Sequence, residues 1–261
     1  MHMMSKRLVF AMLVVGWSFL LHSSSYGGQA LVSAQTVDEV IEKHLTALGG
    51  RAALAKLESR LMIGTITLST PGGEVSGPIE ALAARPNKQR TLIKIDLASL
   101  GAGELTVDQR FDGTSGYMLD SLQGDRAITG SQLELMRASI FPTQFLDYKE
   151  RGAVVELKGK EKLGDAEVFV LTFTPKGGTP VRQYIDATTY LPRRMIATVD
   201  VPGMGALDQV SDFLEQRDVD GVKVPFLVKS TSAAQSFTIN VTRVEHNVKV
   251  DPALFVKPAG K

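Results

Sequence analysis

From residue 61 onward the chain alternates short apolar or β-branched runs with tight turns, and this pattern constrains the fold more than any other feature. Turn dipeptides such as Asp112-Gly113 and Asp220-Gly221 separate neighbouring runs. Parallel winding would require crossover helices that the pattern lacks, so we predict a mainly β (α+β) protein with an antiparallel sheet of about eleven or twelve strands. The expected strands are Leu61–Ser69, Glu74–Ala84, Thr91–Asp96, Glu104–Phe111, Ser115–Asp120, Val154–Leu157, Glu167–Thr174, Val181–Ile185, Arg193–Val201, Leu207–Arg217, Val222–Ser230 and Ser236–Glu245.

Residues 1–34 have the parts of a secretory leader. A positive Lys6-Arg7 pair precedes the apolar run Leu8–Leu21, and small residues end at Ala34. The run is shorter than the roughly 20 residues that a membrane span needs, although an uncleaved N-terminal anchor is the alternative. We therefore expect a signal peptide cleaved after Ala34, or after Ala30, and a single domain over residues 35–261.

Composition narrows the chemistry of the mature chain. The sequence has no Cys, which excludes disulfides, thiolate metal sites and a Cys nucleophile. Removal of the leader leaves 27 basic and 28 acidic residues, a balance that gives no electrostatic case for binding nucleic acid. Only His44 and His246 remain as histidines, and neither has the spacing of a metal or catalytic site. We expect no enzyme, no metal and no cofactor.

Helical segments precede and interrupt the strands. Thr36 and Glu39 form a capping box at the start of an apolar stripe over residues 36–48, and a short second helix or turn is expected over Arg51–Leu57. Between residues 120 and 154 the strand pattern lapses, and Ser131 with Glu134 predicts a second capping box. The apolar face of that helix carries Leu133, Met136 and Ile140, with Phe145 beyond it. Spacing alone leaves open whether this helix plugs a core or covers a cavity.

Four stretches, in the same order, resemble the LolA/LolB superfamily of bacterial lipoprotein-localisation proteins. Residues 77–90 are similar to that family's second strand, which runs into an Arg-Pro turn. Residues 109–120 are similar to its Asp-Gly hairpin with an aromatic strand, and residues 184–192 to a strand-turn-strand unit in its second half. Residues 250–258 are similar to its closing helical turn. The resemblance covers most of residues 36–258.

The resemblance implies a half-open antiparallel β-barrel whose helices lie on the concave face as a lid over an apolar cavity. It also implies a non-catalytic periplasmic carrier of lipid or acylated lipoprotein, monomeric, serving inner- and outer-membrane lipoprotein machinery. The lack of Cys favours the soluble member over the lipid-anchored receptor. Arg85 falls on the family's gate arginine, whose hydrogen bonds hold the lid closed. The expected ligand contacts are Leu133, Met136, Ile140, Phe145, Phe111 and Tyr117.

Two other functions are compatible with the same sequence. An envelope sensor or protein-interaction module on this fold would have a packed interior, whereas a carrier would have a continuous apolar pocket. A hydrolase is the third possibility, and it would depend on His44 or His246.

Overall fold

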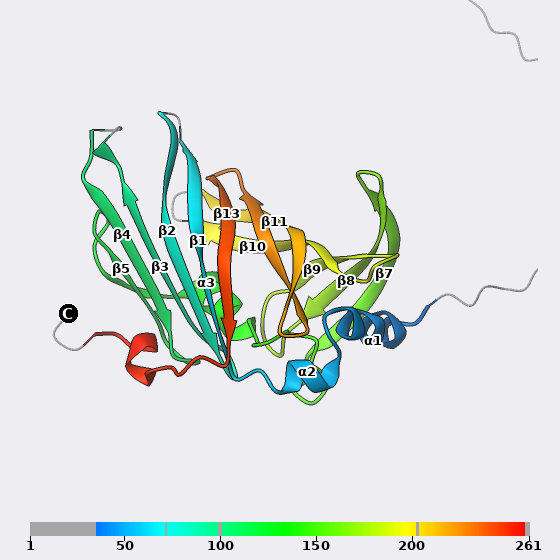
Figure 1. The fold of residues 1–261 in the computed structure, drawn as a ribbon. Coiled ribbons are helices and arrows are strands. Elements are labelled where there is room, and N and C mark those ends of the chain that lie inside the picture. Colours follow the sequence, from blue (N-terminus) through cyan, green and yellow to red (C-terminus); the bar gives the residue numbers. More distant parts are fainter. Residues whose placement is uncertain (1–34, 71, 99–100, 202–203, 259–261) are drawn as a thin grey trace, which may run out of the picture. The chain divides into compact units, whose positions relative to one another are not determined.

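The computed structural model describes residues 35–258 except 71, 99–100 and 202–203, so the expected leader lies outside the described residues. The described strands form one 13-stranded antiparallel sheet in the order β6-β5-β4-β3-β2-β1-β13-β12-β11-β10-β9-β8-β7 (Figure 1). Their bounds are β1 Ser59–Thr70, β2 Gly73–Ala84, β3 Lys88–Asp96, β4 Glu104–Phe111, β5 Gly116–Asp120, β6 Arg126–Ile128, β7 Val154–Leu163, β8 Ala166–Thr174, β9 Val181–Asp186, β10 Pro192–Val201, β11 Gly205–Val219, β12 Val222–Thr231 and β13 Ser236–His246.

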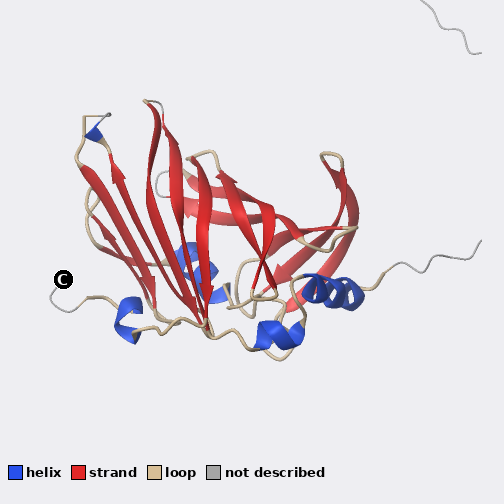
Figure 2. Cartoon of the chain, viewed as in Figure 1, coloured by secondary structure: helices blue, strands red, loops and turns tan. Residues whose placement is uncertain are grey.

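The mainly β, antiparallel prediction is confirmed, but the predicted number of strands is wrong. The additional strand is β6, whose three residues are too few to show an alternating pattern. Strands β6 and β7 are the two edges of the sheet, so the sheet is not closed. Figure 2 shows how the short helices lie against this sheet rather than between its strands.

The helices are α1 (Val37–Ala47), α2 (Arg51–Ala55), α3 (Gly130–Ala138) and the 3-10 turn η2 (Pro252–Phe255). The first capping box is present: Glu39 N donates to Thr36 Oγ1 at 3.2 Å, and Thr36 N donates to Glu39 Oε2 at 2.8 Å. The second is wrong, because α3 begins at Gly130 and its N-cap is Thr129, which makes no side-chain capping bond. Gly130 has φ of 60°, a left-handed turn, and the helix starts two residues earlier than expected. None of the helices in the described ranges has the length and apolarity to cross a bilayer.

Helix α3 lies on the concave face of the curled sheet. Its Met136 packs against Phe111 of β4, Met118 of β5 and Ile128 of β6. The same helix also contacts β10, which is seven positions away from β4 in the sheet order. Both ends of the sheet must therefore curl around α3, as a half-open barrel requires.

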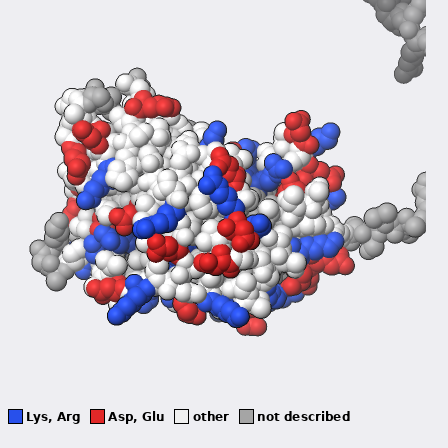
Figure 3. All heavy atoms as spheres, viewed as in Figure 1, with Lys and Arg blue, Asp and Glu red and all other residues white. Residues whose placement is uncertain are grey.

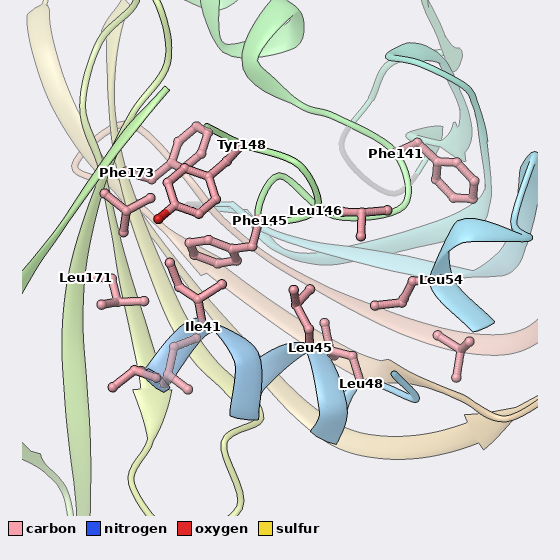
Figure 4. Packing of buried hydrophobic residues seen from close by; sticks show 14 of the residues in the cluster. Ile41, Leu45, Leu48, Leu54, Phe141, Phe145, Leu146, Tyr148, Leu171 and Phe173 are labelled. Carbon is pink, nitrogen blue, oxygen red and sulfur yellow. The ribbon is translucent and has the colours of Figure 1, made fainter. Parts of the chain in front are cut away.

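The largest core cluster lies between α1, the segment after α3 and strands β7–β9. Ile41 and Leu45 of α1 face the same interior as Phe145, Leu171 and Phe173 (Figure 4). Ile41 and Leu45 belong to the apolar stripe that the helical spacing predicts. All five side chains are almost fully buried. The cluster fixes α1 and the post-α3 segment against one end of the concave face.

The C-terminal segment covers part of the opposite, convex face. Turn η2 contacts β3 and β4. There the buried Asp108 accepts hydrogen bonds from Arg90 Nε at 2.8 Å and Arg110 Nη2 at 2.7 Å. Arg110 Nη1 also donates to Val256 O at 3.2 Å. The helical turn expected near residue 252 is thus confirmed, and Arg110 joins it to the sheet.

Candidate functional site

A cavity of about 340 Å³ lies on the concave face, where the helices meet the sheet. Its walls come from α1, α2, the segment of residues 139–145, and strands β1–β3 and β9–β12. The volume is in the range of small-molecule binding pockets, roughly 300–1,000 Å³. We therefore consider this cavity the candidate functional site.

The roof of the cavity is the segment that follows α3, and Phe145 anchors it. The Phe145 ring is 2% exposed and lies edge-on to two rings, with centroids 5.3 Å from His44 and 5.9 Å from Phe173. Figure 4 shows Phe145 pointing down between α1 and the sheet strand that carries Leu171. Aromatic edge contacts of this kind stabilise a buried site by about 0.5–1.5 kcal/mol each beyond the buried area. Phe145 thus holds the roof against α1.

Polar contacts join the same segment to α1. Tyr148 Oη donates to Asp38 Oδ1 at 3.0 Å, and Lys149 Nζ donates to Asp38 Oδ2 at 2.7 Å. The hydrogen bond from Lys149, and then that from Tyr148, lowers the pKa of Asp38 below its usual value. The ion pair of Lys149 with Asp38 is solvent-exposed, so its contribution to stability is small compared with that of Phe145.

The other end of the roof is held by the strands on the far side of the concave face. Gln89 Nε2 of β3 donates to Met136 O at 3.3 Å, and Phe141 N donates to Pro86 O at 2.9 Å. Arg137 Nη2 donates to Thr114 O at 2.9 Å. The roof is therefore attached at both ends, to α1 at one and to β3 and the neighbouring turns at the other.

His44 contributes a neutral imidazole to the cavity wall. Its Nδ1 donates to Tyr190 O at 2.7 Å, and burial lowers its pKa to about 4. His246 lies elsewhere, with Nδ1 3.3 Å from the exposed Asp220, and burial followed by the nearby Arg60 lowers its pKa. Within the described ranges, no cluster of His, Asp and Glu has the geometry to hold a metal ion.

The lining of the cavity includes both apolar and polar residues, whereas the resemblance implies an apolar cavity. Leu48, Leu54 and Phe213 are among its apolar residues, but Arg60 and Lys88 also line it. The Arg60 guanidinium lies 5.4 Å from the centroid of the Phe141 ring, which also lines the cavity. The cavity is therefore more polar than the resemblance implies.

The predicted contact residues fall into three places. Ile140 and Phe145 line the cavity. Leu133, Met136 and Phe111 instead pack together beneath α3, in a cluster separate from the cavity lining. Tyr117 neighbours the inward-facing Met118 on β5 and therefore points to the opposite face, where Lys257 Nζ lies 4.8 Å from its ring centroid.

Arg85 contacts α2 rather than α3. Its Nε donates to Leu57 O at 2.6 Å, and its Nη2 donates to Leu54 O and Ala55 O, both at 3.1 Å. The guanidinium thus bridges three carbonyls at the C-terminal end of α2, where backbone acceptors lack partners within the helix. Leu54 lines the cavity, so Arg85 holds one wall in place.

Sequence reasoning missed Arg60, although a signal was present. Positions 60, 62, 64, 66 and 68 alternate along β1, and Met62, Ile66 and Leu68 pack in the concave core clusters. Arg60 therefore belongs to the inward face of the strand. A cation on an otherwise apolar face indicates a binding site. The expected strand began at Leu61, however, and therefore did not include Arg60.

An open antiparallel sheet curled around a helix, with a cavity beneath the segment that follows this helix, is the architecture expected from the LolA-like resemblance. No protein-family model matches the sequence, and no curated protein matches it. Solved structures do match. A LolA superfamily protein from Nitrosomonas europaea aligns with a TM-score of 0.54 and 14% identity, over 86% of this chain and 99% of its own.

Two further structures align over similar lengths. A DUF1329 family protein from Desulfovibrio piger has a TM-score of 0.53 at 14% identity, over 84% of this chain and 97% of its own. A domain described as an outer membrane lipoprotein-sorting protein, from Vibrio parahaemolyticus, has a TM-score of 0.51 at 12% identity, over 82% of this chain and 93% of its own. The chain has the LolA-like fold, as the motifs predict. Identities this low show the fold alone.

Proposed function

We propose that this protein is a non-catalytic carrier that binds a lipid or the acyl chain of a lipoprotein in the periplasm, as outer-membrane lipoprotein sorting requires. The observation that carries the proposal is the cavity of about 340 Å³ under the segment of residues 139–145. Its size favours a carrier over an interaction module with a packed interior. The LolA-like fold supports the same function.

The ligand chain contacts Ile140 and Phe145 from the roof, and Leu48 and Leu54 from the helices. Burial of each methylene contributes about 0.8 kcal/mol, so a chain of about sixteen carbons gains about 13 kcal/mol and reaches micromolar affinity after an association cost of about 4–5 kcal/mol. The packing of Leu133, Met136 and Phe111 supports the roof from below. Tyr117 is not part of the proposed contact set because it lies on the other face.

The test is saturable binding of a fluorescent fatty acid to the purified protein, together with a matched pair of variants. Ile140→Gln places an amide in the roof, whereas Leu122→Gln changes a turn residue that is 55% exposed and does not line the cavity. We expect Ile140→Gln to weaken binding about tenfold and Leu122→Gln to leave it unchanged. Absence of saturable binding to the unmodified protein would refute the carrier function.

A further inference from the structure

The polar side of the cavity is positively charged. Arg60, Lys88 and Lys223 all line it, and no Asp or Glu is among the described lining residues. Elsewhere the charges are mixed: on the face shown in Figure 3, basic and acidic side chains are interspersed. The accumulation of cations in the cavity therefore differs from the mixed charges on that face.

Two of these cations lack a carboxylate partner in the described part of the chain. Lys223 Nζ lies 3.6 Å from Asp218 Oδ2, but neither Arg60 nor Lys88 forms an ion pair among the described residues. Burial lowers the pKa of Arg60 to about 10, although its side chain is only half-buried and lies over the Phe141 ring. Arg60 and Lys88 are both half-buried, so each cation is partly desolvated and gains from pairing with a bound anion.

A second, independent observation concerns Gln144 in the roof. Its Nε2 atom is buried and has no hydrogen-bond partner within the described ranges, although Gln144 lines the cavity. Buried donors are nearly always satisfied, and an unpaired one carries a cost in free energy. An acceptor oxygen of a bound molecule that reaches Gln144 would satisfy this amide.

Apolar surface lies directly beside these donors. The Arg60 guanidinium is over the Phe141 ring at 5.4 Å, and Phe145 follows four residues later in the same roof segment. A ligand held by Arg60 thus has its next atoms against aromatic rings. The site combines anion-binding donors with an apolar wall, which is the chemistry of an amphiphile.

We propose that the cavity binds an amphiphile with an anionic head group, a carboxylate or a phosphate, that pairs with Arg60, Lys88 and Gln144 while its chain lies on Phe141 and Phe145. This inference rests on the proposed carrier function and specifies the ligand class of the same site. Charge-assisted hydrogen bonds to the head group orient the chain toward the apolar wall. A neutral lipid of the same length lacks this orientation and binds more weakly.

The test compares ligands that differ only in the head group. Decanoate, decyl phosphate, decanol and inorganic phosphate are titrated against purified protein at pH 8, each displacing the neutral dye N-phenyl-naphthylamine. We expect decanoate and decyl phosphate to bind about tenfold more tightly than decanol. Inorganic phosphate should not displace the dye, because it has no chain.

Variants identify the groups responsible. Arg60→Gln and Lys88→Gln should each reduce the preference for decanoate about fivefold and leave decanol binding unchanged, whereas Arg60→Lys should retain most of the preference. Lys229→Gln is the matched control, because Lys229 is exposed and does not line the cavity. If Arg60→Gln does not fold, Lys88→Gln provides the answer, since Lys88 lies at the half-buried start of β3.

The outcomes separate this inference from the carrier function. Equal binding of decanoate and decanol, or a preference that survives in both glutamine variants, would overturn the anionic head group and leave the carrier intact. Displacement by inorganic phosphate as strong as that by decyl phosphate would also overturn it. Failure of both decanoate and decanol to displace the dye would refute the carrier function itself.

Discussion

Acidification from pH 7 to pH 5 should lower the free energy of unfolding by about 2 kcal/mol through His44 alone. The cause is the position of this imidazole in the interface between α1 and the cavity roof. It is 3% exposed, lies edge-on to Phe145, and donates through Nδ1 to Tyr190 O at 2.7 Å. Protonation there would place a charge in an apolar environment without a carboxylate partner.

The magnitude follows from the two pKa values. The unfolded imidazole binds a proton near pH 6.5, whereas burial lowers the pKa of folded His44 to about 4. Between these values the unfolded state binds more protons, so stability rises with pH. The stabilising contribution of His44 is complete above about pH 6.5 and is lost as the pH falls toward about 4. At pH 5, about 1.5 units below the unfolded pKa, the loss is about 2 kcal/mol at 1.36 kcal/mol per unit.

The assay is urea unfolding at pH 5, 6 and 7, with the free energy obtained by linear extrapolation. His44→Gln removes the titrating group and should reduce the loss between pH 7 and pH 5 by about 2 kcal/mol. Burial also lowers the pKa of His246, so His246→Gln is measured in parallel to separate the two contributions. Because each comparison is made within one variant, a change in baseline stability cancels. The same pH dependence in His44→Gln and in the unmodified protein would refute the reasoning.

Two further predictions concern charged residues that stabilise the fold. Arg85→Leu removes three hydrogen bonds to carbonyls at the end of α2 and should lower the free energy of unfolding in urea by about 2–4 kcal/mol. Amide exchange in α2 should become faster, and lipid release should change. Unchanged exchange and release would remove the proposed gate role of Arg85. Asp108→Asn removes the carboxylate shared by two arginines on the convex face and should lower the free energy of unfolding by about 3–5 kcal/mol. Asp212→Asn, in the more exposed pair with Arg194, should lower it by about 1 kcal/mol or less. Equal costs for the two aspartate variants would contradict the assigned burial.

Local patterns explain which parts of this fold are predictable from sequence. The capping box at Thr36 and the stripe of α1 depend only on neighbours within four residues, and both are present. Strand β6 was missed because three residues carry no periodicity, and the start of α3 depends on the left-handed turn at Gly130 rather than on Ser131. Long alternating strands, by contrast, are visible without knowledge of their partners.

The site was harder to predict because strand faces depend on register. A shift of one residue moves every side chain of a strand to the other face. The sequence predicts Tyr117 as a ligand contact on the inner face of β5, whereas Met118 holds the inward position. Ile140 and Phe145 line the cavity, and their contact with a ligand stays a prediction. Arg60 required knowledge of what β1 faces across the cavity, which no local pattern provides.

The most direct test of the central claim is mass spectrometry of lipid extracted from the protein after purification from the envelope of the cells that make it. The account predicts one amphiphile per chain, enriched over bulk envelope lipid, carrying a carboxylate or phosphate, and depleted in Arg60→Gln. Spectra free of lipid, together with no saturable binding of added decanoate, would contradict it.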